Sequence, residues 1–191
     1  MPGRSEKKIL IVSAAESAFT TLRRILGMPA RYAPSGARAE QLLASEHFDA
    51  AIFYTPLTDE FGVQSAVSIA SRRGIAVLLL VKADIYEQAV HQTAGSGVMV
   101  LSKRADPSFF SQAVRMACET SERLAQVRQE NERLRRRLND LETVSRAKCL
   151  LIEHASMSEE EAHAWIGKRA MDNGSTRREV AEEVIRKYAK A

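Results

Sequence analysis

Residues 75–81 read Ile-Ala-Val-Leu-Leu-Leu-Val, an apolar run without a single polar side chain. A surface helix shows a polar face about every 3.6 residues, so a run this short and uniform predicts a strand buried on both faces. Similar runs occupy 8–13 (KILIVS), 49–54 (DAAIFY) and 98–101 (VMVL), and a weaker strand is expected at 30–33.

The segments between these strands have helical length and one-sided apolar spacing. They predict helices over 16–26, 37–45, 60–72 and 85–94. Strand and helix thus alternate through five βα units. This pattern predicts an α/β fold with a doubly wound, five-stranded parallel sheet of the flavodoxin-like order.

A long helix is expected to follow this domain. Asp106 and Pro107 are a strong helix start, because Asp caps a helix N-terminus and Pro suits the first helical position. Neither Gly nor Pro occurs again before Gly167. An unbroken helix over 107–154 would span ~72 Å at ~1.5 Å per residue, more than the α/β domain can cover.

Part of that helix carries a heptad pattern typical of a coiled coil. The a positions are Leu124, Asn131 and Leu138, and the d positions are Val127, Leu134 and Leu141. A lone Asn at an a position suits a parallel two-stranded coil, where the two amides hydrogen-bond across the axis. We therefore predict a parallel homodimer. The alternative is a single amphipathic helix that lies on its own domain.

The last part of the chain predicts a small all-α domain. Ser158 with Glu161, and Thr176 with Glu179, are capping boxes that open two helices, and Asn173-Gly174 closes the first of them. Small residues are expected where helices approach closely: Ala147, Ala162, Ala170 and Ala181. We assign Trp165 to the core with Ala162 and Ile166, the alternative being an exposed ring that stacks on a base.

Composition and charge narrow the class of protein. The chain has 191 residues, 45% apolar and 27% charged, and a net charge of +4, which permits nucleic-acid binding without requiring it. Cys118 and Cys149 have neither metal-ligand nor disulfide spacing. No apolar run is long enough to cross a membrane, and no leader peptide is evident, so we expect a cytoplasmic protein without membrane contact.

The N-terminal domain resembles the receiver domain of two-component response regulators. The resemblance rests on ILIV at 9–12, Phe48-Asp49, Gly62 and Lys103. Phosphoryl transfer in that family needs Mg²⁺ held by carboxylates and an acidic phosphoacceptor. Here four of the corresponding positions hold other residues: Ser13, Ala14, Tyr54 and Val81. Only the lysine of that set is retained, as Lys103.

This pattern indicates a pseudo-receiver with no catalytic residue, metal or cofactor, so we expect a protein that is not an enzyme. Glu16 and Asp59 are interpreted as surface carboxylates, not as a substitute metal site. A regulatory protein or a small ligand at the carboxyl edge of the sheet would then supply the signal. The alternative is a receiver that accepts phosphoryl groups through unusual acids.

The C-terminal domain resembles the ANTAR domain of bacterial transcription antitermination regulators. The matching segments are 146–148 (RAK), 150–153 (LLIE), 158–162 (SEEEA), 169–172 (RAMD) and 178–182 (REVAE), with Cys149 where the family usually has Gly. The resemblance implies binding of RNA hairpins whose formation prevents a terminator from folding. Basic residues that suit RNA are Arg146, Lys148, Lys168, Arg169, Arg177 and Arg178.

The sequence thus predicts three parts: a receiver-like domain at 1–114, a coiled-coil helix at 115–142, and a three-helix RNA-binding domain at 143–191. A parallel dimer would carry both RNA-binding domains at one end of the coil, which favours simultaneous binding of two hairpin loops. Two other classes remain open: a DNA-binding response regulator with a helix-turn-helix, and a protein-interaction scaffold.

Overall fold

The apolar runs form a five-stranded parallel sheet in the computed structural model, which describes residues 7–188. The chain divides into two units, Met1–Gln126 and Val127–Ala191, and each is described by itself. The strands of the first unit are β1 (Ile9–Ser13), β2 (Ala30–Ala33), β3 (Ala50–Tyr54), β4 (Ala76–Val81) and β5 (Val98–Ser102). Their order is β2-β1-β3-β4-β5, which confirms the flavodoxin-like prediction.

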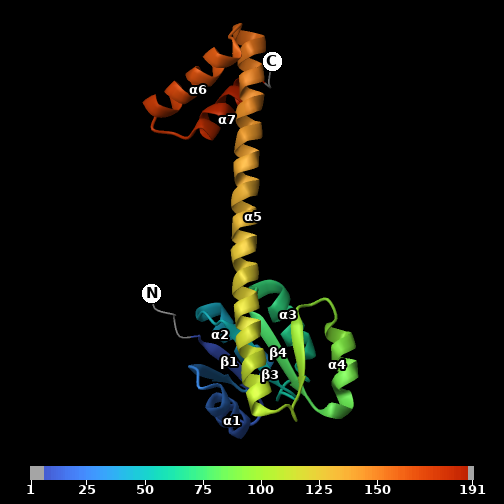
Figure 1. Cartoon of the computed structure of the whole chain (residues 1–191). Helices are drawn as coiled ribbons and strands as arrows, with labels where there is room; N and C mark the ends of the chain where they lie inside the picture. Colours follow the sequence, from blue (N-terminus) through green and yellow to red (C-terminus); the bar gives the residue numbers. More distant parts are fainter. Residues whose placement is uncertain (1–6, 189–191) are drawn as a thin grey trace. The chain divides into compact units, whose positions relative to one another are not determined.

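Helices cover both faces of this sheet (Figure 1). One core lies between the sheet and α2 (Gly36–Ser45), α3 (Val63–Arg73) and α4 (Tyr86–Thr93). The other lies between the sheet, α1 (Glu16–Leu26) and the first turns of α5 (Pro107–Ala155). The central strands β1, β3 and β4 are buried almost throughout, as their unbroken apolar runs require.

The start of α3 differs most from the predicted helix boundaries, and the others shift by at most one residue. Helix α3 begins at Val63 instead of residue 60, because Gly62 has a left-handed φ of 102° and the Leu57 amide donates to the Glu60 carbonyl oxygen at 2.9 Å. These features close a loop over residues 57–62. Before α4 starts, Ala83–Ile85 forms a short 3-10 turn.

Helix α5 starts where Asp106 and Pro107 predict it. The Asp106 Oδ1 accepts hydrogen bonds from the Ser108 amide at 2.8 Å and from the Phe109 amide at 3.4 Å. These bonds satisfy two of the amides that a helix N-terminus leaves without partners. The helix continues to Ala155, one residue beyond the predicted end.

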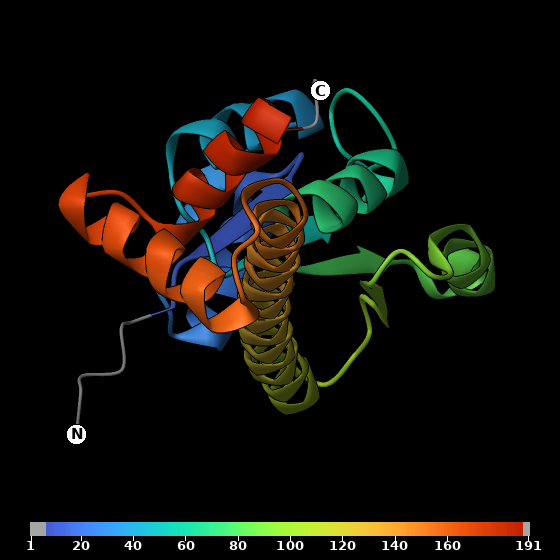
Figure 2. The same cartoon turned by 90° about the horizontal axis from the view of Figure 1, so that it is seen from above.

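The second unit packs α6 (Glu159–Asp172) and α7 (Arg177–Tyr188) against the last turns of α5. Both capping boxes are present: Ser158 with Glu161, and Thr176 with Glu179. All four predicted close-approach alanines are buried: Ala147, Ala162, Ala170 and Ala181. Figure 2 shows α6 in orange and α7 in red, side by side.

Within residues 7–188, no helix is both long enough and apolar enough to span a membrane. The two thiols are free, with Cys118 buried in the first unit and Cys149 exposed on α5. Burial, followed by the negative charge of Asp49, raises the pKa of the Cys118 thiol to about 11. Cys118 therefore stays protonated at neutral pH and reacts slowly.

Candidate functional site

The carboxyl edge of the sheet brings together the positions that bear phosphorylation chemistry in a receiver domain. Ser13 on β1 is paired in register with Tyr54 on β3. Val81 ends β4 beside Ser102 on β5, and Lys103 follows. The register of the strands therefore places the positions matched to the receiver family at one edge of the sheet, as the parallel strand order requires.

The Ser13 hydroxyl and the Lys103 ammonium at this edge both have partners within the chain. The buried Ser13 hydroxyl donates to the Ala15 carbonyl oxygen at 2.8 Å. The Lys103 ammonium lies over the Tyr54 ring, with Nζ 3.6 Å from the ring centroid, and donates to the Thr55 carbonyl oxygen. Burial, followed by the positive charge of Lys82, lowers the pKa of Lys103. An aromatic face and a carbonyl oxygen thus hold this cation where a receiver has carboxylates.

Asp59 serves as a helix cap. Its carboxylate accepts hydrogen bonds from the Gly36 amide at 3.1 Å and the Ala37 amide at 3.2 Å, at the N-terminus of α2. Partial burial opposes the charged form, but these amides outweigh it and lower the pKa of Asp59. In residues 7–188, no three His, Cys, Asp or Glu side chains gather closely enough to hold a metal ion.

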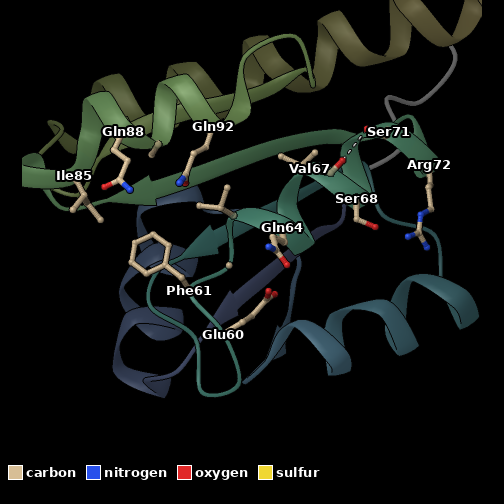
Figure 3. Close-up of a pocket in the computed structure, with 13 residues that line it drawn as sticks. Glu60, Phe61, Gln64, Val67, Ser68, Ser71, Arg72, Ile85, Gln88 and Gln92 are labelled. Carbon is tan, nitrogen blue, oxygen red and sulfur yellow. Dashed lines mark hydrogen bonds between the residues drawn. The ribbon is translucent and has the colours of Figure 1, made fainter.

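Two hollows open on the first unit. The smaller, of about 370 Å³, lies at the carboxyl edge and is lined by Tyr54 and Lys103 together with residues of α1 and the start of α5. The larger, of about 890 Å³, lies between α3 and α4 (Figure 3). Its lining combines Phe61, Val67 and Ile85 with the polar side chains of Gln64, Ser68, Arg72, Gln88 and Gln92. Both volumes suit small ligands.

In the second unit, two of the predicted RNA-binding side chains tie helices together. The Lys148 Nζ lies 2.8 Å from Glu159 Oε1, which joins α5 to α6 and lowers the pKa of Glu159. Arg178 donates to Glu182 at 2.9 Å and to Asp140 at 2.7 Å, joining α7 to α5, and these bonds raise the pKa of Arg178. Both cations therefore have structural partners.

The other four predicted basic residues are exposed: Arg146, Lys168, Arg169 and Arg177. Arg177 crosses from the start of α7 to α6, where its guanidinium lies over Gly167, 3.7 Å from the point that a Cβ there would occupy. Lys168 and Arg169 are neighbours in the second half of α6.

The assignment of Trp165 to the core was wrong. The core face of α6 is built from Ala162, Ile166 and Ala170, and the small residues bring the helices too close to admit an indole between them. The Trp165 side chain is 36% exposed, and the Arg169 guanidinium lies over its ring at 5.8 Å from the centroid. The second unit therefore presents an aromatic ring and a planar cation together on its surface.

The heptad positions of α5 are exposed in the single chain. Leu134 is 51% exposed, Leu138 and Leu141 are each 61% exposed, and Val127 is 64% exposed. Leu124 is 52% exposed, and Asn131 is exposed as well. An apolar seam of this length without cover is typical of an interaction surface.

Comparisons with known proteins agree with both units. The ANTAR domain model matches residues 132–185. The chain is 30% identical over 154 residues to the transcriptional regulatory protein PdtaR of Mycobacterium tuberculosis, an alignment that covers 80% of this chain and 75% of that protein.

Solved receiver domains share the fold of the first unit. A signal receiver domain of an HD domain-containing protein from Pseudomonas fluorescens has a TM-score of 0.59 at 23% identity, covering 66% of this chain and 96% of its own. A CheY-like receiver domain from Methanospirillum hungatei has a TM-score of 0.54 at 18% identity, covering 62% and 98%.

The first unit is thus a receiver-type module, and the second matches a domain of transcription regulators. The chain belongs to the family of ANTAR-domain regulators of transcription that carry an N-terminal receiver domain. Regulation, not catalysis, is the role of this family.

Proposed function

We propose that this regulator is a transcription antiterminator that binds RNA hairpins as a dimer. The observation that carries the proposal is the exposed pair of Trp165 and Arg169 on α6, with Lys168 beside them. The family membership supports it, because the ANTAR match includes all three residues.

The chemistry of this surface suits an RNA loop. Proteins that read RNA sequence grip unpaired loop bases, since side chains cannot enter the deep major groove of A-form helices. An exposed indole offers a stacking face for a base, and a guanidinium can stack and pair with phosphate at once. The exposed cations Arg146 and Arg177 are further candidates for phosphate contacts.

Binding of DNA by the second unit is the less suitable alternative. A recognition helix needs exposed side chains that reach base edges. On α7, the side chains of Val180, Ala181 and Val184 are buried, and the exposed ones include Glu179 and Glu183. These carboxylates would repel the phosphate backbone of DNA.

RNA recovered by the intact protein tests the proposal. Full-length protein incubated with cellular RNA is expected to enrich hairpins in transcript leaders, as read by pull-down and sequencing. The variant Lys168→Glu with Arg169→Glu should lose this enrichment, since it places two carboxylates on the binding surface.

The matched control is Arg186→Glu with Lys187→Glu, which changes the net charge equally at the exposed end of α7. It should retain the enriched hairpins. The proposal fails if the unmodified protein enriches no hairpin, or if it shifts double-stranded operator DNA and no RNA.

We further propose that the receiver domain senses a signal other than phosphorylation. Ser13, Ala14 and Tyr54 supply no carboxylate, and Lys103 is held by Tyr54 and Thr55. A regulatory protein or a small ligand would act instead, and the hollow lined by Tyr54 and Lys103 offers a place for it.

Incubation with acetyl phosphate and Mg²⁺ is expected to leave the mass of the protein unchanged. Without carboxylates at the sheet edge, neither the metal ion nor the phosphoryl group has its ligands. Intact-mass spectrometry measures the outcome, with a receiver that retains its acidic residues as positive control. Stable phosphoryl incorporation at Tyr54 or elsewhere in the first unit would contradict the proposal.

A further inference from the structure

The hollow between α3 and α4 has an apolar floor that is part of the core of the receiver unit. Ala89 belongs to the core on this face of the sheet, and Val67 and Ile85 pack against that core. Core side chains are closely packed and keep their positions. The base of the hollow is therefore a fixed apolar surface.

An exposed aromatic ring stands at one end of this hollow. Phe61 is 44% exposed and lies in the closed loop over residues 57–62. Leu57 supplies the core contact of that loop, and Gly62 follows Phe61 with its left-handed φ. The loop thus holds Phe61 outside the core, where part of the ring is open to a ligand.

Three carboxamide side chains line the hollow: Gln64 on α3, and Gln88 and Gln92 on α4. Figure 3 shows Gln88 and Gln92 extending from α4 toward the loop that carries Phe61. All three are exposed, and none has a hydrogen-bond partner among the side chains and backbone groups that the structure describes. Each carboxamide offers N–H donors and a carbonyl acceptor, so a ligand could pair with groups that the chain does not use.

Charge is placed away from Phe61 and the glutamines of α4. The ionic side chains of the lining are Glu60 and Arg72. The Glu60 Oε1 is buried beside Gly36, so this oxygen faces the start of α2. Arg72 lies at the opposite end of α3 from Phe61 (Figure 3). This part of the hollow therefore suits an uncharged ligand.

We propose that the hollow between α3 and α4 binds a free nucleoside through its base. A planar heterocycle has two apolar faces, one for Phe61 and one for the floor, and a polar edge for the glutamines. Unpaired bases are held in this way elsewhere, by stacking on an aromatic ring and hydrogen bonds to the base edge. A carboxamide pairs with such an edge through its donor and its acceptor at once. The volume of about 890 Å³ accommodates a ligand of this size.

Two other occupants fit less well. A sugar carries hydroxyl groups around its whole ring, and an apolar floor would leave some of them without partners. An amphipathic helix needs an apolar groove, whereas Gln88 and Gln92 line the α4 side of this one. The site shares no lining residue with the hollow at the carboxyl edge of the sheet, and it does not depend on the proposed RNA binding.

Calorimetric titration of the full-length protein with adenosine, guanosine, cytidine and uridine tests the proposal. We expect at least one of them to bind with a dissociation constant of about 100 μM or below, from the usual affinity per non-hydrogen atom. Ribose lacks the base, and indole has an aromatic ring without an amide-type edge. Both should bind at least tenfold more weakly. The inference fails if no nucleoside binds, or if ribose or indole binds equally well.

Substitutions then locate the bound nucleoside. Phe61→Ala and Gln88→Leu should each weaken its binding at least tenfold, while Phe61→Tyr keeps a stacking ring and should stay within about threefold. The matched control is Gln112→Leu on α5, which should stay within about twofold. All three positions are exposed, so the core is not disturbed. Unchanged affinity in both Phe61→Ala and Gln88→Leu would overturn the inference.

The proposed RNA surface of the second unit is tested separately. Trp165→Ala should leave nucleoside binding within about twofold of the unmodified protein. If binding is lost in Trp165→Ala and retained in Phe61→Ala, the nucleoside occupies the second unit, which overturns this inference and leaves the proposed RNA binding intact.

Discussion

Leu134→Glu is expected to convert the protein from a dimer to a monomer. Leu134 is at a d position and 51% exposed in the single chain, so a parallel coil would bury it against its own copy. Burying a Leu side chain stabilises by about 1.5–3 kcal/mol, and the dimer buries two. Two carboxylates facing each other in the seam add a desolvation cost. Together these effects should weaken dimerisation on the order of 100-fold or more.

Sedimentation equilibrium or light scattering over a range of concentrations measures the change. Asn139→Glu is the matched control. It adds the same charge at a b position of the heptad, which faces away from the seam and where the side chain is exposed. It should associate like the unmodified protein. A Leu134→Glu variant that remains dimeric would assign self-association to another surface, and an unmodified protein that is monomeric at micromolar concentration would remove the coil dimer.

Dimerisation bears directly on the strength of RNA binding. When one coiled coil joins two RNA-binding domains, the second binding event becomes intramolecular and has a high effective concentration. We therefore expect Leu134→Glu to weaken binding to paired hairpins more than binding to a single hairpin. An equal loss of affinity for paired and single hairpins would indicate that the two RNA-binding domains act independently.

Much of the fold could be predicted because buried parallel strands leave a direct mark in the sequence. The run at 75–81 became β4 over Ala76–Val81, with every residue buried. Asp106 and Pro107 fixed the start of α5 through local hydrogen bonds alone. Both capping boxes of the second unit are likewise local, and both are present.

Features that depend on long-range packing were not visible in the sequence. Asp59 caps α2, whose N-terminus lies more than twenty residues earlier in the chain. Arg178 forms an ion pair with Asp140, which lies on α5, far earlier in the chain. Neither partner is suggested by spacing, because tertiary structure alone brings the groups together.

The prediction that Trp165 lies in the core was wrong for a different reason. Its spacing to Ala162 and Ile166 fits an apolar face, but spacing does not measure the room between helices. The alanines on either side of Ile166 were the available signal, since small residues permit a close approach that excludes an indole. The same geometry that leaves Trp165 outside the core makes it available to a ligand.

Trp165→Ala is therefore expected to weaken RNA binding by about 5- to 150-fold. Stacking of one base on an aromatic side chain contributes about 1–3 kcal/mol by alanine substitution, which corresponds to this range. Trp165→Phe retains a smaller ring and should recover part of the affinity. Arg169→Lys preserves the charge but not the planar guanidinium, so it should fall between Arg169→Ala and the unmodified protein.

Fluorescence anisotropy with a labelled hairpin measures each dissociation constant, and circular dichroism checks that the helices persist. His163→Ala on the same helix is the control, because His163 is exposed and has no ring contact with Arg169 among the described residues. It should bind RNA within about twofold of the unmodified protein. If Trp165→Ala binds as tightly as His163→Ala while remaining folded, base stacking on α6 is excluded, and the RNA surface must be sought among Arg146 and Arg177.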